Sequence, residues 1–196
     1  MVYRKFLKRV LDFVLAGFFL LLLSPLFIII MVLVRLESAG PVFFKQKRLG
    51  KSGRVFKIWK FRTMQQFHRL SDHQVFHDHP EITRVGRFLR RYKLDELPQL
   101  FNILKGDMAV IGPRPCLPEL KNEFDENGHA RLLVKPGLAG LADINGGYFL
   151  PWPKRWVHDK RYVENISFWL DLKILVRIPF LILFDEDYFL RRNTGL

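Results

Sequence analysis

The clearest pattern along the chain is an unbroken apolar stretch near its start. Phe13 to Val34 comprises 22 positions without a charged side chain, which is long enough for a helix to cross a bilayer. The stretch is too long for the apolar region of a secretory signal peptide, and it lacks a small-residue cleavage site. We therefore expect this segment to be retained.

Ser24 and Pro25 lie in the middle of this stretch, and Pro25 removes a backbone hydrogen bond, which kinks a helix. Basic residues flank the stretch on both sides, and positive flanks favour the cytoplasm. These residues are Arg4, Lys5, Lys8 and Arg9 before it, and Arg35, Lys45, Lys47, Arg48, Lys51 and Arg54 after it. A re-entrant helix that bends at the Ser-Pro pair and has both ends in the cytoplasm satisfies both flanks. A kinked helix that crosses the membrane is the alternative.

After the apolar stretch, the pattern predicts a mostly helical α+β domain with a short β-hairpin. Pro41 to Phe44 and Val55 to Met64 are rich in strand-forming residues, and Gly50 to Gly53 is a turn signal between them. Lys60 and Arg62 are two positions apart and share a face of the second strand, where they would present two cations to one anion. A solvated sheet face is the alternative reading of this alternation.

A basic helix is predicted from Arg84 to Tyr92, with Thr83 as its N-cap. Its apolar residues recur at helical spacing, and the other side carries arginines. These are Arg84, Arg87 and Arg91, with Arg90 nearby. Because the planar guanidinium group donates two parallel hydrogen bonds, this face suits phosphate recognition.

Directly after this helix, Asp95 and Glu96 form an acidic pair between strongly basic segments. Pro98 is tolerated only in a first helical turn, so we expect both carboxylates at a helix N-terminus, where the helix dipole keeps them ionised. An ionised Asp can attack phosphorus, and a neighbouring Glu can bind a hard cation. The alternative is that the pair only complements the dipole.

The remaining segments carry weaker signals. Pro113 and Pro115 stiffen the backbone around Arg114, which indicates a ligand clamp. Leu117 to Asn127 is expected to be a polar surface helix. Ile166 to Phe184 is apolar but interrupted by charges, so we expect an amphipathic helix lying in the membrane plane. The histidine-rich segment from Gln65 to Pro80 fits no closed zinc pattern and is expected to be a loop.

Composition narrows the class of protein. The net charge is +13, from 32 basic and 19 acidic residues, while 49% of residues are hydrophobic. A basic, apolar chain indicates an anionic membrane surface, nucleic acid or a phosphate-rich substrate. Cys116 is the only cysteine, which excludes an intramolecular disulfide and favours a reducing compartment. We expect a membrane anchor over residues 1–36 and a cytoplasmic, membrane-associated catalytic domain over residues 37–196.

These motifs together resemble the small monotopic phosphoglycosyl transferases of the bacterial sugar transferase family. In order, the matching segments are the apolar segment with Ser24-Pro25, FKIWKFRTM, ITRVGRFLRRYKLDELPQLFNILKGDM, GPRP, KPG and YVENISFWLDLKIL. The resemblance implies transfer of a sugar 1-phosphate from a UDP-sugar to a polyprenol phosphate such as undecaprenyl phosphate, at the bacterial inner membrane. It implies that Asp95 forms a covalent phosphosugar intermediate, that UMP is released, and that Glu96 binds Mg²⁺.

Five further positions match polar positions of the family motif. They are Lys60, Arg90, Arg114, Asp159 and Asp171. From their charge we assign the three basic residues to phosphate binding and the two acidic residues to support or to metal binding. The resemblance leaves the donor sugar, the glycan pathway and the oligomeric state open.

Two segments depart from the family pattern. Lys93 stands where a Ser or Thr commonly caps the helix, so the cap must come from elsewhere. Leu141 to Gly147 reads LADINGG instead of the usual WAQVNGR, a change that we expect to affect which donor is bound. A membrane-anchored nucleic-acid-binding module and a catalytically silent scaffold are the competing readings. No nucleic-acid-binding motif is found, and the intact acidic pair argues against both.

Overall fold

The structure is a computed structural model that describes residues 2–65 and 80–183. Most of the histidine-rich segment predicted to be a loop lies outside the described residues. The helices are α1 (Lys8–Leu22), α2 (Ser24–Glu37), α3 (Arg84–Arg91), α4 (Gln99–Lys105), α5 (Glu126–Ala130), α6 (Trp152–Glu164) and α7 (Phe168–Leu183), and the strands are β1 (Phe43–Leu49), β2 (Val55–Phe61), β3 (Ala109–Ile111) and β4 (Gly137–Ala139). Short helical turns occupy Tyr3–Leu7, Lys51–Gly53, Leu94–Glu96, Pro118–Glu123, Arg131–Leu133, Asp143–Asn145 and Gly147–Phe149.

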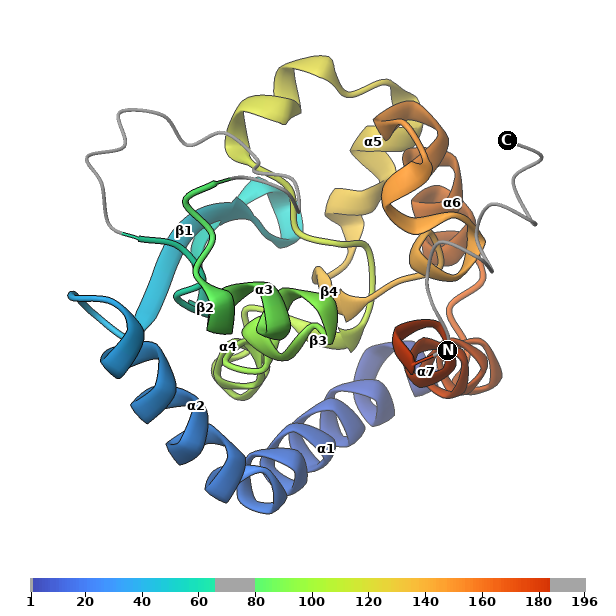
Figure 1. Cartoon of the computed structure of the whole chain (residues 1–196). Helices are drawn as coiled ribbons and strands as arrows, with labels where there is room; N and C mark the ends of the chain where they lie inside the picture. The colour runs from blue at the N-terminus through green and yellow to red at the C-terminus, as the bar shows by residue number, and fades with distance from the viewer. Residues whose placement is uncertain (1, 66–79, 184–196) are drawn as a thin grey trace.

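The mostly helical α+β architecture agrees with the prediction (Figure 1). Strands β1 and β2 form an antiparallel hairpin that pairs Phe43 with Phe61 and Leu49 with Val55, around the turn predicted at Gly50 to Gly53. A second, parallel pair joins β3 to β4. The sequence did not predict this pair, because each of its strands is only three residues long.

The apolar stretch folds as two helices, α1 and α2, and the chain bends by 63° between them. Together they form a V in Figure 1. Leu23 separates them, and Pro25 lies in the first turn of α2, where its missing N–H costs no hydrogen bond. The Ser24 hydroxyl donates to the Leu21 carbonyl at 2.8 Å. Within the described residues, no single helix is long and apolar enough to cross a membrane, and only the bent pair together reaches that length.

One side of the V packs against the rest of the protein. Ala16 of α1 lies in a core with α4, while Phe27, Ile30 and Val34 of α2 pack with the hairpin and α3. The other side leaves large apolar side chains exposed. On α1 and α2 they are Val10, Phe13, Val14, Phe18, Phe19, Leu21, Leu22, Ile28, Ile29, Val32, Leu33 and Leu36. The V therefore shares its hydrophobic cores with the elements that surround the acidic pair.

Arg62 does not share a face with Lys60, so this prediction was wrong. Strand β2 ends at Phe61, and the alternation of faces ends with it. The buried Arg62 guanidinium donates to the backbone carbonyls of Val34, Ser38 and Pro41. Arg62 thus binds carbonyls in the last turn of α2, where backbone acceptors lack partners within the helix, and in the segment that follows it.

Two helix boundaries also differ from the prediction. Pro98 immediately precedes α4 and is not in its first turn, and Asp95 and Glu96 belong to a separate 3₁₀ turn. The segment predicted as one helix over 117–127 is a 3₁₀ segment followed by the short α5. The basic helix α3, its Thr83 cap and the apolar helix α7 agree with the prediction.

Candidate active site

The acidic pair lies in a 3₁₀ turn between α3 and α4, and both carboxylates are buried. Lys93, directly before the turn, adopts a left-handed backbone conformation with φ of 55°. This conformation ends the path of α3 and reverses the chain direction. No side chain caps the turn. Asp95 and Glu96 thereby reach the space between the hairpin and the segment after β3.

The Glu96 carboxylate accepts three hydrogen bonds from two cations. Arg114 Nη2 lies 2.6 Å from Oε1 and 2.5 Å from Oε2, and Lys60 Nζ lies 2.7 Å from Oε1. Burial alone would raise the pKa of Glu96, but Arg114 and Lys60 outweigh it and hold the pKa well below its usual range. Glu96 is therefore a fixed anion that orients the two cations.

Asp95 is placed differently. Its carboxylate accepts no hydrogen bond from the described residues, and its closest cation is Lys60, with Nζ 4.0 Å from Oδ2. Burial raises the pKa of Asp95, while Lys60 opposes that rise. The sequence predicted that the helix dipole keeps both carboxylates ionised, but the structure moves their pKa values in opposite directions. Asp95 is the acid of the pair whose oxygens are available to a substrate.

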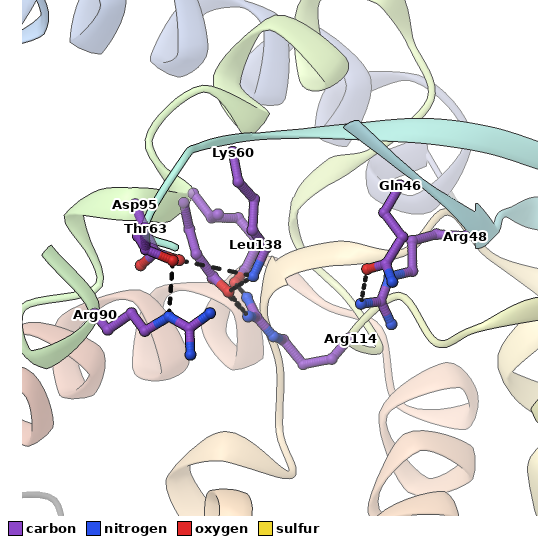
Figure 2. A network of polar contacts seen from close by, with 9 residues as sticks. Gln46, Arg48, Lys60, Thr63, Arg90, Asp95, Arg114 and Leu138 are labelled. Carbon is purple, nitrogen blue, oxygen red and sulfur yellow. Dashed lines mark hydrogen bonds and ion pairs between the residues drawn. The ribbon is translucent and has the colours of Figure 1, made fainter. Parts of the chain in front are cut away.

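Arg90 approaches Asp95 from α3. Its Nε donates to the Thr63 hydroxyl at 2.9 Å, and its charge lowers the pKa of Asp95. The close approach of α3 to the chain after β2 depends on Gly86, because a Cβ there would lie 2.1 Å from the Thr63 carbonyl oxygen. Figure 2 shows Lys60, Arg90 and Arg114 around the acidic turn. Arg90, Asp95 and Lys60 therefore come from three separate elements that a glycine contact brings together.

Arg114 is held in place by hydrogen bonds to residues that follow it in the sequence. Its Nη1 donates to the Leu138 carbonyl, and its own carbonyl accepts from Arg131. Arg131 Nε lies 3.4 Å from Asp159 Oδ2, and both side chains are almost completely buried. Burial raises the pKa of Asp159 to about 6, against the opposing charge of Arg131. Asp159 thus acts on Arg114 through Arg131, a residue that the sequence analysis missed because nothing in its local pattern distinguishes it.

Asp171 lies away from the acidic pair. Its carboxylate accepts hydrogen bonds from the hydroxyls of Tyr3 and Tyr162 at 2.6 and 2.7 Å, and from Lys8 Nζ at 2.6 Å. These bonds fasten α7 and α6 to the start of α1. The arrangement explains a buried acid in an apolar helix, and it gives Asp171 a structural role at the start of the V.

Asp143, in the segment that departs from the family pattern, is near Arg114. Its carboxylate accepts from the Gly140 N–H at 2.7 Å. Burial raises the pKa of Asp143, and Arg114 opposes that rise. This position is consistent with an effect on donor choice.

The acidic turn fits a Mg²⁺ ion only in part. A carboxylate offers about four lone-pair positions, and three are used by the hydrogen bonds that Glu96 accepts. One position on Glu96 and the unbonded oxygens of Asp95 are left. Among the described residues there is no cluster of three or more metal-binding side chains. Mg²⁺ commonly binds through one or two carboxylates, substrate phosphates and water, which is what this turn can offer.

Comparison with known proteins adds to this geometry. A model of the family described as bacterial sugar transferase matches residues 3–185. The chain belongs to that family. This sugar transferase is 44% identical over 169 residues to an uncharacterized sugar transferase, EpsL, of Bacillus subtilis, covering 86% of this chain and 83% of the relative.

Two further relatives have names that state an activity. One is the UDP-N-acetylgalactosamine-undecaprenyl-phosphate N-acetylgalactosaminephosphotransferase of Aeromonas hydrophila, 41% identical over 179 residues, covering 88% of this chain and 42% of the relative. The other is the UDP-glucose:undecaprenyl-phosphate glucose-1-phosphate transferase of Escherichia coli, 41% identical over 182 residues, covering 87% of this chain and 39% of the relative. This sugar transferase thus spans about two fifths of the length of these two proteins.

Proposed function

We propose that this sugar transferase moves a sugar 1-phosphate from a UDP-sugar to undecaprenyl phosphate and releases UMP. The observation that carries the proposal is the difference between the two adjacent carboxylates. Glu96 is locked by Arg114 and Lys60, while Asp95 accepts no hydrogen bond from the described residues and faces Lys60. The names of the relatives support the donor and acceptor classes.

Asp95 is the proposed nucleophile. One carboxylate oxygen attacks the phosphorus that carries the sugar, a P–O bond forms, and the bond to the bridging oxygen breaks as UMP leaves. The phosphate of undecaprenyl phosphate then attacks the same phosphorus and displaces the Asp95 carboxylate. The products are the lipid diphosphate sugar and the free carboxylate, so atoms and charges balance over the two steps.

The cations around the turn suit these displacements. Lys60 and Arg90 lie on the Asp95 side, where they would neutralise phosphate oxygens during both steps. We assign Arg114 to holding Glu96 in place, with its Nη1 anchored on Leu138. Mg²⁺, bound through Glu96 and the substrate, would neutralise the diphosphate of the donor.

We further propose that α1 and α2 form a re-entrant hairpin in the cytoplasmic membrane, with the active site on the cytoplasmic face. The 63° bend, the exposed apolar side and the basic flanks support this placement. Single cysteines at Val2 and Lys47, in a Cys116→Ala background, should be labelled by an impermeant reagent from the same side of sealed vesicles. Labelling from opposite sides would favour a crossing helix.

The chemistry is tested with purified full-length protein, Mg²⁺, undecaprenyl phosphate and a panel of UDP-sugars. Wild type should release UMP, and without acceptor it should retain radioactive sugar phosphate on the polypeptide after acid quenching. Asp95→Asn should lose both signals, because the amide is not a nucleophile. Glu123→Gln removes an exposed carboxylate and is the matched control. Sugar phosphate retained by Asp95→Asn would show that another residue forms the intermediate.

A further inference from the structure

A second cavity lies apart from the acidic turn. It has a volume of about 240 Å³ and is formed by the start of α1, strand β3, the segment before β4 and the end of α6. Its wall includes Ile111, Leu133, Tyr162 and Ile166. The cavity is not lined by any of the residues assigned to catalysis above. It is therefore a separate space with its own chemistry.

The charge on its wall is strongly positive. Five basic residues line the cavity and only one acid, Asp12, does so. The basic residues are Arg4, Lys8, Arg9, Lys51 and Lys135. Asp12 is already used, because its carboxylate accepts from the Val110 N–H at 3.0 Å and lies 3.8 Å from Lys8 Nζ. The wall thus keeps an excess of cations.

Only Lys8 among these cations is neutralised, by Asp171 at 2.6 Å. Arg9 donates to the carbonyls of Ile103 and Leu104 at the end of α4, which are uncharged. In the part of the chain that the structure describes, Arg4, Lys51 and Lys135 form no ion pair with a carboxylate. These cations are held together by the fold and not by acidic partners.

Two of the cations converge on one point beside Gly106. A Cβ added there would lie 3.1 Å from Arg9 Nη2 and 3.5 Å from Lys135 Nζ. Burial lowers the pKa of Lys135 and the neighbouring charges of Arg9 and Lys51 lower it further, while Asp12 and Asp107 oppose that fall. Like charges placed this close repel one another, and an anion between them would relieve that repulsion.

The cavity shares α1 with the exposed apolar side of the V, because Lys8, Arg9 and Asp12 line it while Val10 and Phe13 of the same helix are exposed. Figure 1 shows the start of α1 beside α7, and Tyr3, just before α1, packs against Phe168. Beyond the cavity, Val10 and Phe13 of α1 and Trp169 of α7 are exposed. An anion whose acyl chains lie along these side chains would reach the cavity from a bilayer.

We propose that this cavity binds the phosphate group of an anionic membrane phospholipid. Arg4, Arg9, Lys51 and Lys135 surround the phosphate, while the acyl chains follow the apolar side of α1 and α7. The cavity volume of about 240 Å³ is far above the roughly 10–15 Å³ that one water requires, which leaves room for a lipid headgroup. This proposal rests on the proposed membrane placement of α1 and α2, but it does not depend on the proposed sugar-phosphate transfer.

The test measures binding of radiolabelled phosphatidylglycerol to the full chain in a neutral detergent. The variant is Lys51→Gln with Lys135→Gln, because within residues 2–65 and 80–183 neither side chain forms a hydrogen bond or an ion pair whose loss would disturb the fold. Lys57→Gln with Lys154→Gln removes the same charge from exposed positions outside the cavity and is the matched control. Melting temperatures of both double variants confirm that they fold.

Wild type and the control should bind the lipid saturably, and the cavity variant should bind about 30-fold more weakly, as expected for the loss of two cations near an anionic headgroup. Equal affinity of the cavity and control variants would overturn the proposal. Inorganic phosphate that displaces the label as well as unlabelled phosphatidylglycerol does would show a free phosphate site and overturn the lipid assignment. Because no donor or acceptor is added, the result is independent of UMP release.

Discussion

The buried carboxylate of Asp171 gives the sharpest prediction about stability. It joins Tyr3 and Lys8, at the start of the chain, to Tyr162 in α6. Asp171→Asn keeps the size of the side chain and removes its charge. Lys8, whose side chain is only 13% exposed, then loses its closest partner.

The magnitude follows from burial. Breaking one side of a buried ion pair costs about 3–5 kcal/mol, and hydrogen bonds to a charged group contribute about 1.5–3 kcal/mol each. We therefore expect Asp171→Asn to lower the free energy of unfolding by about 4 kcal/mol. For a chain of this length, 1 kcal/mol shifts the melting temperature by about 2–4 °C, which gives a fall of about 8–16 °C.

The assay compares melting temperatures of the detergent-solubilised protein. The matched control is Glu126→Gln, because Glu126 Oε1 also lies 2.6 Å from a lysine, Lys160. The Glu126 side chain is 86% exposed, against 9% for Asp171. An exposed pair contributes little, so the control should melt like wild type. Similar shifts in the two variants would refute the argument that burial, not distance, sets the strength of these pairs.

Two further predictions concern residues that support the active site. Asp159 has its pKa raised from 3.8 to about 6, so its contribution to stability is present below pH 3.8 and is lost as the pH rises through 6. Between pH 3.8 and 6, the free energy of unfolding of wild type should fall by about 3 kcal/mol relative to that of Asp159→Asn. If the stabilities of the two proteins changed in parallel with pH, the prediction would be contradicted. Gly86→Ala should destabilise by about 1–3 kcal/mol and reduce UMP release, since its Cβ would meet Thr63 at 2.1 Å. Gly17→Ala, with no atom within 4 Å of the added Cβ, should be neutral or stabilising, and an equal loss in both variants would rule out the contact.

Local patterns predicted the elements that local chemistry determines. The hairpin turn at Gly50 to Gly53 and the Thr83 cap both depend on a few neighbouring residues, and the structure confirms them. The bend at Ser24-Pro25 also depends on local sequence, because Pro25 favours the start of a new helix at this point.

Predictions failed for side chains whose partners lie far away in the sequence. Arg62 was assigned to an anion from strand periodicity, but its guanidinium donates to the carbonyls of Val34 in α2 and of Ser38 and Pro41 after it, all more than 20 positions away. The partners of Asp159 and Asp171 lie 28 and 163 positions away, so their roles could not be worked out from spacing. The resemblance marked both residues as important, and only the fold shows that they hold other groups in place.

The contacts of Asp171 also bear on how the protein is made. Lys8 and Asp171 are separated by 163 positions, and bacterial and other ribosomes add roughly 5–20 residues per second. The apolar V therefore leaves the ribosome about 8–30 s before the residue that fastens it to α7. During that interval Tyr3 and Lys8 lack the carboxylate that binds both of them in the folded protein. Stalled or shortened chains that end before Asp171 would leave Tyr3 without this acceptor and Lys8 with only Asp12 as an acidic partner, and quality-control proteases would meet an apolar V that is not yet fastened to α7.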